Sequence, residues 1–155
     1  MRFHRWHDTC IGISPMPSGK VLDDALVPIF ILADDDREAT QRFLERANEE
    51  WFYVAVPNPR QVVRYAKRFA TTAVFLSEPI SYPKGGAAKL LQELLDEVES
   101  PVIVLTEEWG PGVTAKWKRM GASDCLLHPT RVVRKMESVR AKMQELALRS
   151  VKPKE

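Results

Sequence analysis

Hydrophobic and polar residues follow two different periods along this chain, and together they predict a repeated strand–helix order. Continuous apolar runs at residues 29–33, 51–56, 73–76, 101–105 and 124–127 have the length and composition of buried strands. Between these runs apolar residues recur every three or four positions, as Ala39, Phe43 and Ala47 do. That spacing is typical of helices that pack along one side. The pattern predicts five strands, each followed by a helix.

Signals at the helix ends support these elements. Asn58 followed by Pro59 combines a capping residue with a proline, which predicts the start of the second helix. A short fourth helix around residues 113–120 is expected to end at Gly121. The spacing of apolar residues places the last helix from Val132 to about Leu148.

Apolar strands separated by helices predict a parallel sheet that is covered on both faces. Right-handed crossovers then give a doubly wound, three-layer α/β/α sandwich over residues 28–148. Residues 1–27 lack a sustained period and contain Pro15, Pro17 and Gly19, so an irregular N-terminal arm is expected there. Residues 149–155 are expected to form a basic C-terminal tail.

Length and composition fit one globular domain. The chain has 155 residues, of which 45% are hydrophobic and 28% charged. No apolar stretch approaches the roughly 20 residues that a membrane span needs, so no membrane association is expected. Arg2 and Arg5 are not followed by an apolar segment, and Cys10 and Cys125 lie far apart in the sequence. Both features favour a reduced, cytoplasmic setting.

The net charge is +2, and residues 131–155 contain eight Lys or Arg and three Asp or Glu. A basic tail can bind nucleic acid. Here the positive residues alternate with apolar residues and with Glu137 and Glu145, which favours a solvated helix face. Nucleic acid is therefore an unlikely partner, and a nucleic-acid-associated regulatory module is kept as an alternative function.

Polar side chains follow four of the five predicted strands, and the carboxyl ends of parallel strands meet at one edge of the sheet. These residues are Asp34 and Asp35, Ser77 and Glu78, Thr106, and His128. Carboxylates suit Mg²⁺, a hydroxyl can contact a phosphoryl oxygen, and a basic group can balance developing charge. The set predicts a pocket of the phosphoryl-transfer type.

Three segments, residues 30–36, 101–107 and 121–129, resemble response-regulator receiver domains of the chemotaxis-regulator type, and the resemblance extends over residues 28–148. It implies a flavodoxin-like sheet with strand order 2-1-3-4-5 and a role in two-component signal transduction by phosphorelay. It also implies an acceptor Asp at the end of the third strand, a conserved hydroxyl at Thr106 and a Lys where this chain has His128. The family's aromatic switch residue corresponds to Cys125.

The chain departs from the family pattern at the acceptor. Residues 73–79 contain no Asp, and the spacing to Asp35 and Thr106 favours Glu78 at that position, with Ser77 as the alternative. Asp to Glu moves the nucleophilic oxygen by roughly 1.5 Å, and a misplacement near 1 Å can cost about a hundredfold in rate. Glu78 is expected to mimic an activated carboxyl-phosphate near Thr106, to point to solvent, or to pair with His128. Asp35 and Glu78 are the tentative Mg²⁺ ligands, and no other cofactor is expected.

These changes predict a stand-alone, degenerate pseudo-receiver that is not an enzyme and that signals through contacts with protein partners. A working Mg²⁺-dependent phosphoreceiver that uses Glu78 or Ser77 is the alternative. Trp109 and Trp117 flank the fourth helix and are the candidate partner surface. A homodimer through the fourth and fifth helices is the second expectation for assembly.

Overall fold

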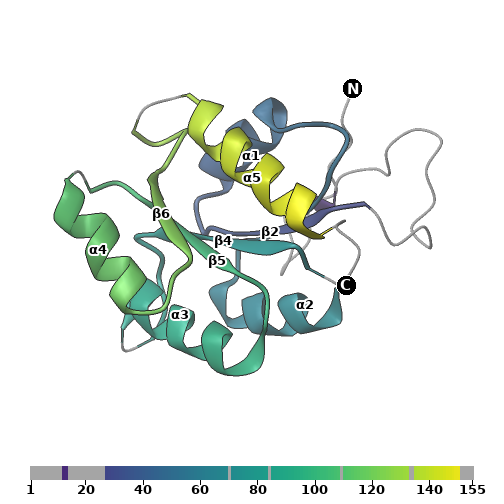
Figure 1. Ribbon diagram of the computed structural model, residues 1–155. Coiled ribbons are helices and arrows are strands. Elements are labelled where there is room, and N and C mark those ends of the chain that lie inside the picture. Colours follow the sequence, from purple (N-terminus) through teal and green to yellow (C-terminus); the bar gives the residue numbers. More distant parts are fainter. Residues whose placement is uncertain are drawn as a thin grey trace.

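The computed structural model describes residues 12–13, 27–69, 71–83, 85–108, 110–132 and 135–150. Five parallel strands form its centre: β2 (Ile29–Ala33), β3 (Phe52–Val56), β4 (Ala73–Glu78), β5 (Val102–Thr106) and β6 (Asp124–Leu127). They lie side by side in the order β3-β2-β4-β5-β6 (Figure 1). The predicted order 2-1-3-4-5 of a doubly wound sheet is therefore confirmed.

A short sixth strand extends the sheet. β1 (Gly12–Ile13) pairs with β3 in the antiparallel direction, so that Gly12 faces Ala55 and Ile13 faces Val54. The expectation of an irregular segment over residues 1–27 is wrong at these two positions, and most of that segment lies outside the described residues. The added strand gives hydrogen-bond partners to backbone groups of β3 that an edge strand would leave open.

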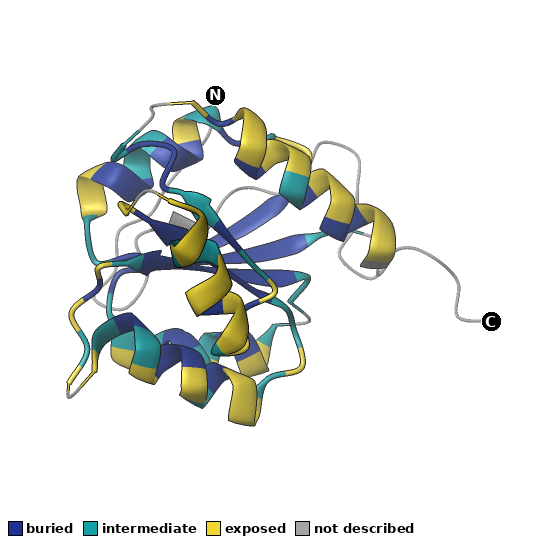
Figure 2. Ribbon diagram, turned by 60° about the vertical axis from the view of Figure 1, so that its left-hand side comes forward, coloured by how far each residue is buried: buried dark blue, intermediate teal, exposed yellow. Residues whose placement is uncertain are grey.

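The helices cover both faces of the sheet, as expected. They are α1 (Arg37–Arg46), the 3-10 turn η2 (Pro59–Gln61), α2 (Val62–Arg68), α3 (Gly86–Glu97), α4 (Pro111–Arg119) and α5 (Glu137–Ser150). α1 and α5 pack on one face around Phe30 and Phe75, while α2, α3 and α4 pack on the other. Figure 2 shows the buried strands between helices whose outer sides are exposed. None of the described helices is long and apolar enough to cross a membrane.

Asn58 and Gly121 lie at element ends, as expected, but Asn58 begins the 3-10 turn η2 and α2 itself begins at Val62. The Asn58 side chain accepts a hydrogen bond from the backbone N–H of Arg60, at 3.1 Å, and so caps η2. Gly121 follows α4 with φ near +111°. A side chain at Gly121 would also push aside the end of the Leu95 side chain, which can move, so the positive φ is the main reason for glycine here.

The last helix begins later than predicted, at Glu137 rather than Val132. Residues 128–132 instead form a turn in which the backbone N–H of Val132 donates to the carbonyl of His128 at 3.1 Å. This turn directs Thr130 and Arg131 toward the carboxyl edge of the sheet. The apolar spacing does not predict the turn, because the turn depends on contacts with other segments of the chain. α5 also includes Arg149 and Ser150, which were assigned to the basic tail, and residues 151–155 lie outside the described part of the chain.

An ion pair joins β6 to α5 and so helps to set the position of that turn. Lys142 Nζ lies 2.8 Å from Asp124 Oδ2. Burial raises the pKa of Asp124, but the hydrogen bonds from Lys142 and from the Cys125 backbone outweigh it, so the net pKa is lowered. The hydrogen bond to Asp124 is also the main reason that the pKa of Lys142 is raised.

We expect the Lys142→Met substitution to lower the free energy of unfolding by about 0.5–1 kcal/mol at pH 7. A lowered carboxylate pKa gives stability that is present above the unfolded value and is lost as the pH falls through the folded value. The raised pKa of Lys142 gives stability that is lost only when the pH rises through its folded value. Urea unfolding at pH 7 and at about pH 3 should therefore show that the difference from wild type shrinks in acid. Arg149→Met is the control, since Arg149 is exposed and 4.0 Å from Glu145.

Candidate functional site

Polar side chains gather at the carboxyl edge of the sheet, in an otherwise apolar interior. Asp34, Ser77, Thr106, His128 and Thr130 are all buried there. Each lies at or just after the carboxyl end of a strand, and the parallel register of β2, β4, β5 and β6 brings the strand ends together. Buried polar groups of this kind need hydrogen-bond partners, so their contacts define the site.

The carboxylate of Asp34 is the centre of the site. Its Oδ1 accepts hydrogen bonds from the backbone N–H of Asp36, at 2.9 Å, and from Arg131 Nη2. Its Oδ2 accepts from Ser77 Oγ, at 2.9 Å, and from His128 Nε2, at 3.0 Å. A carboxylate has about four lone-pair positions, and side chains and backbone of the described residues use all of them. The carboxylate is thus held by this chain's own donors.

His128 is fixed by contacts on both ring nitrogens. The backbone N–H of Thr130 donates to His128 Nδ1 at 3.3 Å, and the Thr130 hydroxyl donates to the carbonyl of Ala39 at 3.2 Å. Nδ1 is therefore an acceptor, which leaves the proton on Nε2, where it is donated to Asp34. A neutral ring is enough for this arrangement. The side chain is only 1% exposed.

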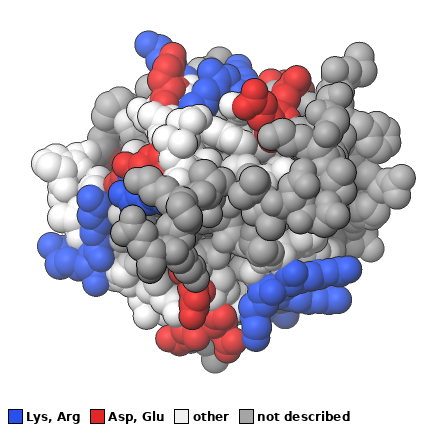
Figure 3. All heavy atoms as spheres, turned by 45° about the vertical axis from the view of Figure 1, so that its right-hand side comes forward, with Lys and Arg blue, Asp and Glu red and all other residues white. Residues whose placement is uncertain are grey.

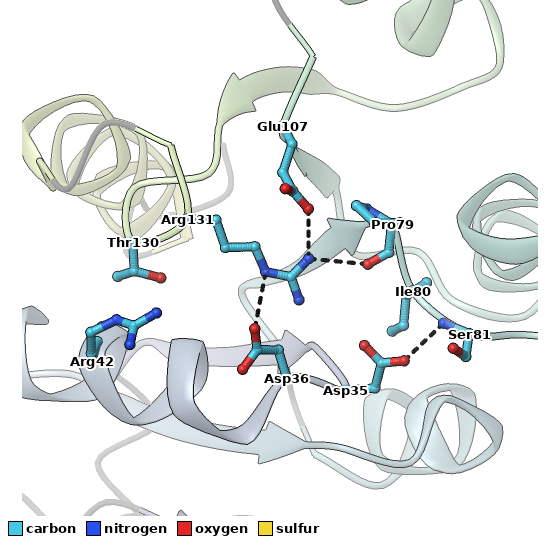
Figure 4. Close-up of a pocket in the computed structure, with 9 residues that line it drawn as sticks. All are labelled: Asp35, Asp36, Arg42, Pro79, Ile80, Ser81, Glu107, Thr130 and Arg131. Atoms are coloured by element: carbon cyan, nitrogen blue, oxygen red, sulfur yellow. Dashed lines mark hydrogen bonds and ion pairs between the residues drawn. The ribbon is translucent and has the colours of Figure 1, made fainter.

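Arg131 closes the site from the turn after β6. Its Nη1 lies 3.1 Å from Glu107 Oε2 and 3.2 Å from the carbonyl of Pro79, and its Nε lies 3.8 Å from Asp36 Oδ2. Figure 4 shows the guanidinium between these oxygens, at the wall of a pocket of about 540 Å³. One cation thus connects the turn after β6 to the loops after β2, β4 and β5.

The structure separates the two candidates for the acceptor position. Adjacent residues of a strand point to opposite faces of the sheet. Ser77 follows Phe75 on the α1/α5 face and hydrogen-bonds to Asp34. Glu78 lies opposite Thr106 in the register, and its Oε2 accepts a hydrogen bond from Thr106 Oγ1 at 3.1 Å. The side chain beside Asp34 and His128 is therefore Ser77, whereas spacing along the chain favoured Glu78.

The sequence predicts three possible arrangements for Glu78. The hydrogen bond from Thr106 agrees with the one in which the Glu78 carboxylate lies near the Thr106 hydroxyl. Thr106 Oγ1 also accepts from the backbone N–H of Glu108 at 3.1 Å. His128, the other predicted partner of Glu78, is hydrogen-bonded to Asp34 instead. Thr106 and Glu78 form one pair, and Asp34, Ser77 and His128 form a separate group.

The two carboxylates predicted to bind magnesium make separate contacts in this structure. The tentative ligands Asp35 and Glu78 are engaged apart from each other, since Asp35 Oδ2 accepts from the backbone N–H of Ser81 at 2.9 Å and Glu78 contacts Thr106. Within the described ranges, no group of three or more His, Cys, Asp or Glu side chains is arranged to hold a metal. The structure gives no support to the predicted Asp35–Glu78 metal site.

The predicted switch residue and partner surface lie near α4. Cys125 is buried in β6, and burial, with the carboxylates of Asp124 and Glu78, raises the pKa of its thiol to about 11. Trp109 lies outside the described residues. Trp117 is only 3% exposed and belongs to the core beneath α4. The expectation that Trp117 forms a partner surface is therefore wrong, because the residue faces the sheet.

Arg131 is a site residue that the sequence patterns do not predict. The apolar spacing puts it just before the expected last helix, among the positive charges of the C-terminal segment. Its position three residues after His128, in the loop that follows a strand, was the available signal. Loops at the carboxyl edge carry the binding residues of open α/β sheets, and a cation in that loop faces the acidic loop after β2.

No protein-family model and no curated protein matches this sequence. Among solved structures, the Francisella response regulator 1452 receiver domain is similar, with a TM-score of 0.66 and 16% identity over 79% of this chain and 98% of that chain. A two-component response regulator from Clostridium difficile has a TM-score of 0.65 and 17% identity, over 81% and 99% of the two chains.

A Burkholderia pseudomallei response regulator is also similar, with a TM-score of 0.58 and 20% identity over 79% of this chain and 69% of that chain. That structure contains a phosphorylated aspartic acid and a calcium ion. At these identities the similarity concerns the fold. Together with the strand order and the polar carboxyl edge, it shows that this chain has the fold of a response-regulator receiver domain.

Proposed function

We propose that this protein is a receiver-like signalling module that acts through contacts with protein partners and does not accept a phosphoryl group. The receiver fold supports the signalling role. Residues 73–79 lack the Asp that the resemblance places at the end of the third parallel strand. In this proposal the module is not an enzyme, since no step of group transfer occurs on it.

The observation that carries the proposal is the Asp34 carboxylate with all of its hydrogen-bonding positions in use. A phosphoryl-accepting site needs carboxylate oxygens that can hold a metal or a nucleophile that a donor can reach. Ser77, the side chain beside Asp34, is 2% exposed and already donates its hydroxyl proton to that carboxylate. At Asp34 and Ser77 the arrangement therefore supports the proposal, because it leaves neither a free carboxylate oxygen nor a free hydroxyl.

The hydrogen bond between Thr106 and Glu78 supports a single signalling state. In the family that the sequence resembles, the hydroxyl at this position moves when the acceptor is phosphorylated. Here a carboxylate from the neighbouring strand already holds Thr106 Oγ1 at 3.1 Å. We infer that the module presents one fixed surface, and that its output depends on how much protein and partner are present.

Incubation with acetyl phosphate and Mg²⁺, followed by intact-mass measurement, tests the proposal. We expect the wild-type mass to stay unchanged, while a receiver domain with an intact acceptor Asp, treated in the same tube, gains one phosphoryl group. A phosphoryl adduct on wild-type protein would contradict the proposal. Its location at Ser77 or Glu78, found by peptide mass spectrometry, would then support the phosphoreceiver alternative.

The identity of the partner and a homodimer through α4 and α5 stay predictions, as does the cytoplasmic setting. The face that Figure 3 draws gives the nucleic-acid alternative little support. Figure 3 shows one face on which coloured basic and acidic side chains lie in separate small groups rather than in one basic field. We therefore propose a protein, rather than a nucleic acid, as the partner.

A further inference from the structure

Arg131 makes contacts that resemble those of a bound metal ion more than those of a surface arginine. Its side chain is 11% exposed, although it carries a full charge. The oxygens around it come from Asp34, Asp36, Glu107 and the carbonyl of Pro79. Three carboxylates and a carbonyl from three different loops thus converge on one cation.

We propose that the Arg131 guanidinium takes the place of a divalent cation in this pocket and makes it independent of metal. The inference rests on the proposed function, because it explains how the same site is closed to phosphoryl chemistry. It also goes further, since it assigns a role to a residue that the family resemblance does not include.

The chemistry of the two cations supports the exchange. Mg²⁺ requires oxygen ligands in near-octahedral geometry at about 2.0–2.1 Å. A guanidinium instead offers five N–H donors in a plane, stays charged at every accessible pH, and matches carboxylate oxygens in pairs. Here Arg131 Nη1 donates to Glu107 and to the carbonyl of Pro79, Nη2 donates to Asp34, and both oxygens of Asp34 already accept hydrogen bonds.

Tethering also favours the internal cation. Arg131 lies three residues from His128, which is itself hydrogen-bonded to Asp34. The guanidinium therefore faces the carboxylates at an effective concentration on the order of millimolar, as for groups joined by a short linker. A metal from solution would have to displace it and leave its charge without a partner.

Removal of Arg131 should uncover a cation site. Without the guanidinium, the carboxylates of Asp34, Asp36 and Glu107 lose their shared counter-charge and one donor to Asp34. In the described residues these carboxylates are not arranged to hold a metal, so we expect their side chains to turn toward an added Mn²⁺ or Mg²⁺ once the guanidinium between them is gone. We expect Arg131→Ala to bind Mn²⁺, measured by calorimetry and by electron paramagnetic resonance, at least about tenfold more tightly than wild type.

The thermal midpoint of Arg131→Ala should rise by about 3–6 °C at a metal concentration ten times the dissociation constant, whereas that of wild type stays constant. Arg42→Ala is the matched control. Arg42 lines the same pocket, but its ion pair is with Glu38 of its own helix, at 2.7 Å. This variant should behave like wild type toward Mn²⁺. Adding Asp34→Asn to Arg131→Ala should abolish the new binding.

Three outcomes would overturn the inference. The first is saturable Mn²⁺ binding to wild type that Asp34→Asn removes. The second is a folded Arg131→Ala or Arg131→Gln variant that binds no more Mn²⁺ than wild type. The third is that both variants stay unfolded at millimolar Mn²⁺, because the metal is expected to restore the lost counter-charge. None of these experiments uses a phosphodonor, so the proposed function is tested separately by the mass measurement.

Discussion

Replacing Asp34 by Asn is expected to lower the free energy of unfolding by about 3–5 kcal/mol, the cost of breaking a buried, hydrogen-bonded charge pair. The amide keeps nearly the same size, but its NH₂ group cannot accept the hydrogen bonds that now reach one of the carboxylate oxygens. Ser77 and His128 both donate to Oδ2, and Arg131 would lose its closest counter-charge. Urea unfolding followed by circular dichroism measures the change.

Asp35→Asn is the matched control for this effect. Asp35 precedes the same helix and carries the same charge, but its Oδ2 accepts one hydrogen bond, from the backbone N–H of Ser81. Its substitution should lower the free energy of unfolding by no more than about 1 kcal/mol, as for partly exposed charges and single hydrogen bonds. Equal and small costs at both positions would show that Asp34 is not the centre of the buried network.

The second large effect is expected at Trp117. Truncation to Ala should lower the free energy of unfolding by about 3–5 kcal/mol, because it leaves a cavity between α4 and the sheet. The side chain is 3% exposed and packs in the core cluster that covers the α2/α3/α4 face. If Trp117 contacted a partner instead, its truncation would change the free energy of unfolding of the isolated protein only slightly.

Trp117→Phe separates ring packing from the indole N–H. Trp117 Nε1 is buried, and no hydrogen bond to it is found among the described residues. The loss of the indole N–H should therefore not lower the free energy of unfolding further. We expect Trp117→Phe to lower it by less than about 1.5 kcal/mol. Lys116→Ala is the neighbouring surface control, since Lys116 Nζ lies 5.3 Å from the Trp117 ring centroid and contributes at most about 1 kcal/mol. A cost for Ala no larger than that for Phe would contradict a core role.

The periods in the sequence were enough to predict the sheet and its order. Ile29 to Ala33 is apolar at every position because helices cover both faces of that strand. The chain order of strands and helices, with right-handed crossovers, then brings Asp34, Ser77, Thr106 and His128 to one edge. These four residues are buried there as a set.

Local sequence could not predict β1 or the late start of α5. Two residues, Gly12 and Ile13, form a strand only because β3 offers its open edge, which is a contact between distant segments. In the same way, Thr130 and Arg131 stay outside α5 because they contact the α1 region and the loops after the strands. Apolar spacing carries no information about such contacts.

The sequence by itself determined that this protein is a parallel α/β sandwich whose carboxyl edge collects acids, hydroxyls and an imidazole, because the strand and helix periods are local properties. Only the tertiary structure decided that Ser77 rather than Glu78 lies beside Asp34, since a shift of one residue along a strand moves a side chain to the other face. It also decided that Arg131 reaches these carboxylates and that Trp117 faces inward. Both depend on how separate loops and helices pack, which no local pattern records.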